Sequence, residues 1–270
     1  MSEPQVSLGR PDYTALVFGP PLEDRPYVIA NMVSSADGKV VIEGTEQGLG
    51  SPDDQALMRE LRFHADVVMN GAGTLRASGT SSRVPEALQR RREAAGRTPN
   101  PLGAVVTSTG ELPLERAFFT ARDFEAMVYV SEEAGTPRLD TLRATGRPVV
   151  VVPVGAGIAW VLRHMRQELD ASLLLVEGGP SLNGELFDGG LIDELFLTLG
   201  SLVVAGDGTR TAVESERPAA LGAVARLELV SAAANPGTSE VYLRYRVGGG
   251  ASAGAGRGSG PRGARPSRSD

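Results

Sequence analysis

The sequence predicts an α/β fold, in which strands and helices alternate around one mixed sheet. Strand-like apolar runs are separated by amphipathic helical stretches, turn residues mark the joins, and the last two strand-like segments are typical of an antiparallel pair. Hydrophobic residues make up 41% of the 270-residue chain, which is enough for a substantial core. We therefore expect one domain whose sheet is closed by its final two strands.

The expected elements follow one another along the chain. The strands cover residues 27–33, 66–69, 104–107, 126–130, 148–152, 173–176, 194–199, 226–232 and 240–247. The helices cover residues 51–64, 85–95, 157–168 and 180–187. The first helix has the clearest signals, with Ser51 as N-cap, Pro52 at the first position, and Leu57, Met58 and Leu61 as its buried stripe.

The two ends of the chain are expected to lie outside the domain of residues 27–247. Residues 1–26 contain five prolines and are interpreted as an N-terminal arm. Residues 248–270 are rich in Gly, Ser and Arg, with no apolar side chain larger than alanine, and are expected to form a disordered tail. The basic tail is interpreted as a solvated extension, with contact to RNA or an acidic partner as the alternative.

Composition excludes several classes of function. The formal net charge of −6 argues against a general nucleic-acid surface. The absence of cysteine removes disulfides, thiolate metal sites and cysteine nucleophiles, so no metal site is expected. The longest uncharged run, 148–162, is too short to span a bilayer, and the N-terminus lacks the apolar stretch of a secretory signal. We expect a soluble, cytoplasmic protein with no membrane partner and no specific nucleic-acid partner.

The most informative stretch, 173–190, joins a buried-strand pattern to a helix start through a glycine pair. Gly178 and Gly179 allow the backbone to pass close to a ligand, and Pro180 suits the first helical turn. The free N–H groups at the start of a helix favour a phosphate or pyrophosphate. A plain connection between a strand and a helix is the alternative interpretation.

A second glycine segment follows the strand over 66–69. Gly71 and Gly73 are separated by one residue, which suits close approach of the backbone to a phosphate. Arg76 stands where the dinucleotide fingerprint has its third glycine, so a standard Rossmann fold is not expected. The two segments together favour a nucleotide cofactor whose own atoms carry the reaction.

Lys39 is the single lysine of the chain, against 26 arginines. It follows the first strand, two residues after Asp37, so an ammonium and a carboxylate could together orient a polar substrate or polarise a carbon–nitrogen double bond. A solvated turn built around Asp37 and Gly38 is the alternative interpretation.

Four motifs in order resemble a known family. They are ANMVSSADGKV (30–40), GSPDD (50–54), VVMNGAGTLRAS (67–78) and LLLVEGGPSLNGELFDGGLIDEL (173–195). Over residues 27–208, with weaker support to 247, the chain resembles the riboflavin-biosynthesis reductase domain, the C-terminal half of the bifunctional pyrimidine deaminase/reductase. The resemblance implies a three-layer, dihydrofolate-reductase-like fold with a mostly parallel sheet between helices on both faces, NADPH as cofactor, and a homodimer. It also implies reduction of the ribosyl group of a 5-phosphoribosylamino-pyrimidine to ribityl; the zinc deaminase half is not expected, since its signatures need cysteines.

The resemblance assigns roles to residues that match the family motifs. The residues expected to bind the cofactor are Gly71, Gly73, Thr74, Arg76, Thr107, Ser108, Gly178, Gly179, Pro180, Ser181 and Leu182. The residues expected to face the nicotinamide and the substrate are Asn31, Ser35, Asp37, Lys39 and Glu177. Among these, Lys39, Asp37 and Glu177 are the candidate catalytic residues. The segment at Thr107 carries no acidic residue that would repel a 2′-phosphate, which favours NADPH over NADH.

Two departures from the family pattern fall on the substrate side. Residues 77–80 read Ala-Ser-Gly-Thr where riboflavin-pathway members usually have Ala-Asp-Asp-Pro, and Gly50 stands where a threonine is common. Three hypotheses therefore remain open: a reductase of a ribosylaminopyrimidine phosphate, a reductase of a pterin or another imine, and an inactive NADP-binding oligomeric module.

Overall fold

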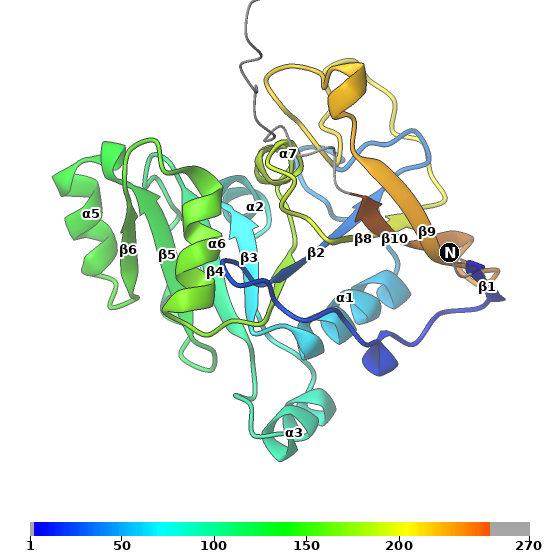
Figure 1. Ribbon diagram of the computed structural model, residues 1–270, viewed down its shortest axis with the longest axis horizontal. Helices are drawn as coiled ribbons and strands as arrows, with labels where there is room; N and C mark the ends of the chain where they lie inside the picture. Colours follow the sequence, from blue (N-terminus) through cyan, green and yellow to red (C-terminus); the bar gives the residue numbers. More distant parts are fainter. Residues whose placement is uncertain (1–2, 249–270) are drawn as a thin grey trace, which may run out of the picture.

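A computed structural model describes residues 3–248, which form a ten-stranded sheet in the order β1-β9-β10-β8-β2-β7-β3-β4-β5-β6. Neighbouring strands run parallel except where β10 pairs with β8 and with β9. The strands are β1 (Gln5–Leu8), β2 (Tyr27–Ser34), β3 (Val67–Gly71), β4 (Leu102–Thr107), β5 (Ala126–Ser131), β6 (Val149–Val152), β7 (Leu173–Val176), β8 (Glu194–Leu199), β9 (Arg226–Asn235) and β10 (Glu240–Gly248). In Figure 1 the β6 edge lies on the left and the β1 edge on the right.

Helices cover both faces of the sheet. They are α1 (Pro52–His64), α2 (Ala72–Ala77), α3 (Glu86–Ala94), α4 (Ala117–Thr120), α5 (Thr136–Arg143), α6 (Gly157–Gln167) and α7 (Pro180–Asp188), with 3₁₀ turns η1 (Tyr13–Ala15), η2 (Glu132–Ala134) and η3 (Leu221–Ala223). Apolar residues of α6 and α7 pack on one face, and those of α1, α4 and α5 pack on the other. None of the helices in residues 3–248 has the length and hydropathy that a membrane span requires.

The expected α/β architecture is confirmed, with every expected strand and helix present and boundaries within three residues. The antiparallel pair at the end of the chain is also confirmed. Sequence reasoning missed β1, α2, α4 and α5. These elements are short, and α2 begins directly after Gly71 and contains Gly73, a residue that disfavours helix interiors.

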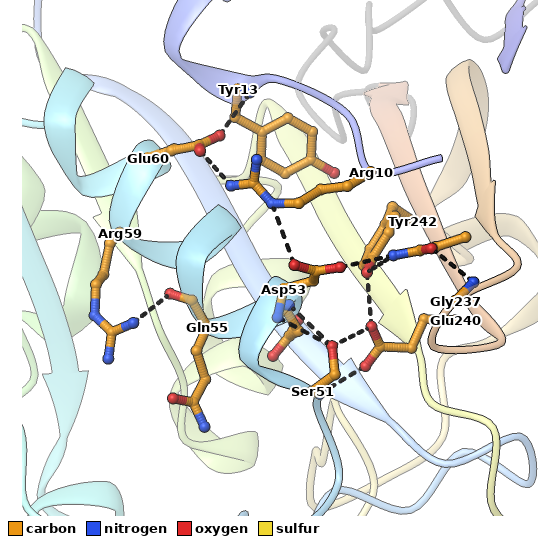
Figure 2. Close-up of polar contacts among 12 residues, drawn as sticks. Arg10, Tyr13, Ser51, Asp53, Gln55, Arg59, Glu60, Gly237, Glu240 and Tyr242 are labelled. Atoms are coloured by element: carbon orange, nitrogen blue, oxygen red, sulfur yellow. Dashed lines mark hydrogen bonds and ion pairs between the residues drawn. The ribbon is translucent and has the colours of Figure 1, made fainter. Parts of the chain in front are cut away.

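The described part of the expected N-terminal arm is attached to the domain. The strand β1 extends the sheet by pairing with β9. Tyr13 is only 6% exposed, and its ring packs edge-on against Phe196 at 5.2 Å. Figure 2 shows Glu60 of α1 accepting from the Tyr13 backbone N–H and pairing with Arg10. The expected tail lies, except for Gly248, outside the described residues.

The start of α1 is fixed to the C-terminal strand pair by a buried carboxylate. Glu240 of β10 accepts hydrogen bonds from the Ser51 backbone N–H at 2.7 Å and the Ser51 hydroxyl at 2.6 Å (Figure 2). The Tyr242 hydroxyl also donates to Glu240, at 2.6 Å. Ser51 in turn accepts from the backbone N–H groups of Asp53 and Asp54 as the N-cap. The network sets the position of the first turn of α1 relative to the sheet.

Candidate active site

A cleft of about 790 Å³ lies at the carboxyl ends of β2, β3, β4 and β7. Ligands of open α/β sheets bind at this end of the strands, because the loops that follow parallel strands meet there. The lining includes both glycine segments that the sequence singled out, together with one face of α1. The cleft is larger than a second cavity of about 290 Å³, which lies beside Leu112 and Leu114.

The two glycine segments touch each other. They follow β3 and β7, which are neighbouring parallel strands with Met69 opposite Val176. The Gly71 N–H donates to the Gly178 carbonyl at 2.8 Å. Gly178 has φ +85°, a conformation that favours glycine, and the peptide bond between Gly178 and Gly179 is cis. The structure thus joins two segments more than 100 residues apart into one wall of the cleft. We call this surface, formed by residues 71–73 and 178–179, the glycine wall.

This wall has no room for extra side chains. A Cβ on Gly71 would lie 3.3 Å from the Gly179 nitrogen, and one on Gly179 would lie 3.2 Å from the Thr74 hydroxyl oxygen. Gly179 is the N-cap of α7 and supplies no side-chain cap, so the first N–H groups of that helix are available to an anion. The chemistry of this wall fits a diphosphate, because backbone donors and a helix N-terminus converge on one small volume.

Arg210 adds a cation to the same wall. Its guanidinium donates to the Ser181 hydroxyl at 3.1 Å and forms an ion pair with Glu214, and the side chain lines the cleft. It also lies 3.9 Å from the place a Cβ on Gly73 would occupy. Sequence reasoning missed Arg210, because no local pattern around it signals a site.

The cleft continues along the end of β4. Thr107, Ser108 and Thr109 line it, and the Thr107 hydroxyl accepts from the Gly110 N–H at 3.1 Å. Arg76 lies in the same region and donates to the Glu111 carbonyl at 3.0 Å. All eleven residues expected to bind the cofactor line this one cleft.

The expected substrate residues divide into two groups. Asn31 and Glu177 line the cleft, whereas Ser35, Asp37 and Lys39 do not. Ser35 is fully buried and donates to Asp37 at 2.6 Å, while the Lys39 ammonium lies 3.4 Å from the Thr209 carbonyl. The structure therefore does not bring the Lys39 and Asp37 side chains to the cavity. Their placement agrees with the alternative interpretation, a turn built around Asp37 and Gly38.

Asp37 is used as a structural acceptor. Besides Ser35, the backbone N–H groups of Val204 and Ala205 donate to its carboxylate, at 3.1 and 2.8 Å. The hydrogen bond from Ser35, followed by those from Val204 and Ala205, lowers the pKa of Asp37 to about 2. Asp37 stays ionised at neutral pH and holds the 204–205 segment against the turn.

Glu177 forms a buried ion pair with Arg62 of α1. The Arg62 Nε and Nη2 atoms donate to the two Glu177 oxygens at 2.6 and 2.8 Å. The side chains are 9% and 6% exposed. Because both carboxylate oxygens already accept from Arg62, this geometry suits positioning of a neighbour better than proton delivery. Sequence reasoning missed Arg62, although its place on the buried side of α1, one position after Leu61, is an unusual one for an arginine.

Asp54 is another carboxyl that lines the cleft, and sequence reasoning assigned it no role there. It is 8% exposed and lines the cavity. Burial raises the pKa of Asp54 to about 6; a hydrogen bond with Thr198 opposes the rise and the charge of Glu240 adds to it. The helical spacing could have indicated this position, because Asp54 precedes Met58 by four residues and Arg62 by eight and so lies on the same face of α1.

A family model described as the RibD C-terminal domain matches residues 26–237. The chain belongs to this family. It is therefore an oxidoreductase of the riboflavin-biosynthesis reductase type, and membership of this reductase family implies a nicotinamide cofactor. The resemblance on which the sequence expectations rested is confirmed.

Relatives and solved structures agree with this family. The chain is 31% identical, over 211 residues, to 2,5-diamino-6-ribosylamino-4(3H)-pyrimidinone 5′-phosphate reductase of Methanothermobacter thermautotrophicus, a match that covers 76% of this chain and 91% of the relative. It is 28% identical to the protein of the same name from Archaeoglobus fulgidus, covering 71% and 88%. A pyrimidine reductase-like protein of Corynebacterium diphtheriae shares the fold with a TM-score of 0.74 at 21% identity, covering 83% and 92%. The chain therefore has the fold of a pyrimidine reductase-like protein.

Proposed function

We propose that the protein reduces the ribosyl group of a 5-phosphoribosylamino-pyrimidine to ribityl with NADPH. The observation that carries this proposal is the contact between the two glycine segments, which places them and the start of α7 together on one side of a single cleft. The names of the archaeal relatives support a phosphorylated aminopyrimidine as the substrate. Bound NADPH would supply a hydride to C1′ of the open-chain imine while the imine nitrogen gains one proton.

In this proposal the glycine wall holds the diphosphate of the cofactor. The Gly71 and Gly179 backbones approach closely because neither carries a side chain. The free N–H groups at the start of α7 donate to phosphate oxygens, and the guanidinium of Arg210 offsets the negative charge. Holding the cofactor in one orientation is itself catalytic, because it replaces a bimolecular encounter with an aligned pair of reactants.

The end of β4 supports NADPH over NADH. Thr107 and Ser108 offer hydroxyl groups, and Arg76 adds a guanidinium to the same part of the cleft. The four acidic residues of the lining come from other segments; they are Glu46, Asp54, Glu177 and Glu185. A 2′-phosphate at this end of the cleft would therefore meet donors and positive charge.

The other half of the cleft would hold the substrate. Asn31 of β2 lines the cleft, as does the Arg62–Glu177 pair, which joins α1 to the end of β7. Glu177 is a positioning residue in this proposal, since Arg62 already occupies both of its oxygens. The buried pair gives the floor of the cleft a fixed shape, which serves alignment of C1′.

The decisive experiment follows NADPH absorbance with the purified full-length protein. Oxidation of NADPH that depends on the phosphoribosylamino-pyrimidine supports the proposal. Oxidation with 7,8-dihydrofolate alone would instead identify a pterin reductase, and NADPH binding without turnover of either would identify an inactive binding module. Under the same proposal the homodimer, measured by analytical ultracentrifugation, and the cytoplasmic location stay predictions.

Replacing Lys39 by alanine tests the remaining candidate catalytic residue. If the ammonium leaves the Thr209 carbonyl to polarise a substrate oxygen, kcat falls about 10- to 100-fold while the Kd for NADPH changes little. Steady-state kinetics and calorimetry measure the two quantities separately. A parental kcat in Lys39→Ala would assign Lys39 to the turn alone.

A further inference from the structure

The segment that follows β8 is tied to the turn after β2. We call this segment, residues 202–214, the strap. The Ala36 backbone N–H donates to the Leu202 carbonyl at 2.8 Å. The Val40 backbone N–H donates to the Arg210 carbonyl at 2.9 Å. These two hydrogen bonds lie on either side of the turn, so the first two thirds of the strap have a fixed position relative to β2.

Asp37 holds the bend of the strap between these two hydrogen bonds. Its carboxylate accepts from the Val204 N–H at 3.1 Å and from the Ala205 N–H at 2.8 Å. Ala205 has φ +60°, an uncommon conformation for a residue with a side chain, which persists only where the surrounding structure enforces it. The Ser35 hydroxyl, which donates to Asp37 at 2.6 Å, belongs to a fully buried residue. The carboxylate is therefore fixed on one side and fixes the bend on the other.

The far end of the strap lies on α7. The Asn183 side-chain amide donates to the Ala212 carbonyl at 2.8 Å, and the Glu214 N–H donates to the Pro180 carbonyl at 3.0 Å. A Cβ on Gly184 would lie 2.0 Å from the Glu214 carbonyl oxygen, so the helix and the strap are in direct contact. The strap thus connects the turn after β2 to the helix whose N-terminus adjoins the glycine wall.

Arg210 lies between the two ends of the strap and offers a free donor to the glycine wall. Its Nε and Nη2 atoms are paired with Glu214, and Nη2 also donates to the Ser181 hydroxyl at 3.1 Å. Within residues 3–248, no hydrogen bond uses Nη1, which lies 3.9 Å from the position of a Cβ on Gly73. The guanidinium is planar, so Glu214 and Ser181 set the direction of Nη1. An anion at the glycine wall would be the partner of this donor.

We propose that Asp37 is a positioning residue for the cofactor: it fixes the bend of the strap and so holds Nη1 of Arg210 where it meets the diphosphate. The inference rests on the proposed function, in which the glycine wall binds that diphosphate. The Asp37 side chain is no part of the cleft lining, so its effect reaches the cofactor only through the strap. Asp37 then serves cofactor affinity, whereas the spacing of Asp37 and Lys39 in the sequence suggested contact with the substrate.

Loss of the Asp37 carboxylate releases the bend. The N–H groups of Val204 and Ala205 then bond to water, and Ala205 leaves φ +60° for a conformation that costs less. Arg210 is no longer held in one position, and ordering it again on binding consumes part of the binding free energy. The affinity for NADPH falls although no residue of the cleft lining has changed.

The test measures the Kd for NADPH by calorimetry on the full chain, with Asp37→Ala, Arg210→Ala and the double variant. Arg210→Ala is expected to raise the Kd about 10-fold, and Asp37→Ala about 5-fold. The double variant is expected to match Arg210→Ala, because Asp37 acts through Arg210. A parental Kd in either single variant, or multiplied effects in the double variant, would overturn the inference and leave the proposed function standing. Absence of NADPH binding by the parent would instead remove the proposed function.

Salt dependence and kinetics separate positioning from a purely structural role. The attraction between a partly exposed guanidinium and a diphosphate is screened by salt, so the Kd of the parent rises with KCl concentration. The rise is expected to be shallower, and equally so, in Asp37→Ala and Arg210→Ala. Asp37→Ala is also expected to raise KM for NADPH while kcat at saturating NADPH stays near the parental value. A lower kcat with an unchanged KM for NADPH would assign Asp37 to the substrate and overturn the inference.

Two further variants control for charge and folding. Asp207→Ala removes a carboxylate from the same bend, where no hydrogen bond or ion pair of the described chain involves the Asp207 side chain, and its Kd is expected to stay within about two-fold of the parent. Asp37→Asn keeps the size of the side chain and one acceptor, so its Kd is expected between those of the parent and Asp37→Ala. It decides the same question if thermal unfolding shows that Asp37→Ala does not fold. Equal Kd increases in Asp207→Ala and Asp37→Ala would contradict the assignment.

Discussion

Gly179→Asp is expected to raise the Kd for NADPH at least about 100-fold. The new Cβ would lie 3.2 Å from the Thr74 hydroxyl oxygen, in the space that the proposal gives to the diphosphate of the cofactor. Aspartate is also a good N-cap, so its carboxylate would accept the N–H groups of α7 that the proposal gives to a phosphate. Lost hydrogen bonds and charge repulsion together amount to about 3 kcal/mol, which corresponds to the stated change in Kd.

Calorimetry with NADPH measures this effect, and two variants isolate its cause. Gly179→Ala adds the Cβ without the charge and is expected to weaken binding less. Gly222→Asp makes the same change where a Cβ meets nothing within 4 Å and which is not part of the cleft lining, so its Kd should equal that of the parent. An unchanged Kd for NADPH in Gly179→Asp would show that the cofactor does not bind at the glycine wall.

Arg62→Met is expected to destabilise the protein by about 3–5 kcal/mol at neutral pH. The substitution leaves Glu177, whose side chain is 6% exposed, as a buried carboxylate without its partner. It also removes the hydrogen bond from Arg62 Nη1 to the Arg83 carbonyl at 3.1 Å. The pair links α1 to the end of β7, so its loss separates the helix from the floor of the cleft.

Urea unfolding measures the change in the free energy of unfolding. Arg90→Met is the matched control, because the Arg90–Glu86 pair lies on the surface with side chains 65% and 81% exposed, and its loss should cost less than about 1 kcal/mol. Combining Arg62→Met with Glu177→Leu is expected to recover most of the stability, since no charge is then left buried. Equal losses in the free energy of unfolding for Arg62→Met and Arg90→Met would contradict the prediction that the buried ion pair contributes more to stability than the surface pair.

Local sequence patterns predicted each of the two loops of the glycine wall, but not the contact between them. The apolar run 173–176 and the glycine pair after it identified the strand, the loop and the start of α7, and the segment at Gly71 was found in the same way. That these two loops form one site depends on β3 pairing with β7, which brings Gly71 and Gly178 within hydrogen-bond distance. Strand order is set by packing of the whole sheet, so no window of sequence contains it.

The spacing of Asp37 and Lys39 suggested a substrate site, and here the sequence left two interpretations open. The structure favours the turn, because Asp37 accepts backbone N–H bonds from Val204 and Ala205. These donors lie more than 160 residues away in the chain. An isolated Asp-Gly turn and a turn that anchors a distant loop have the same local sequence.

The sequence by itself determined most of the element types, the family and the residues proposed to bind the cofactor, because periodicity, caps and glycine-rich motifs are local properties of the chain. Only the tertiary structure decided which charges meet in the cleft. Arg62 and Glu177 are 115 residues apart, and Asp54 acquires its unpaired, buried environment from Thr198 and Glu240. Burial and pairing of a charge depend on neighbours brought together by folding. The charge environment of the proposed substrate half of the cleft could therefore not be predicted from the sequence alone.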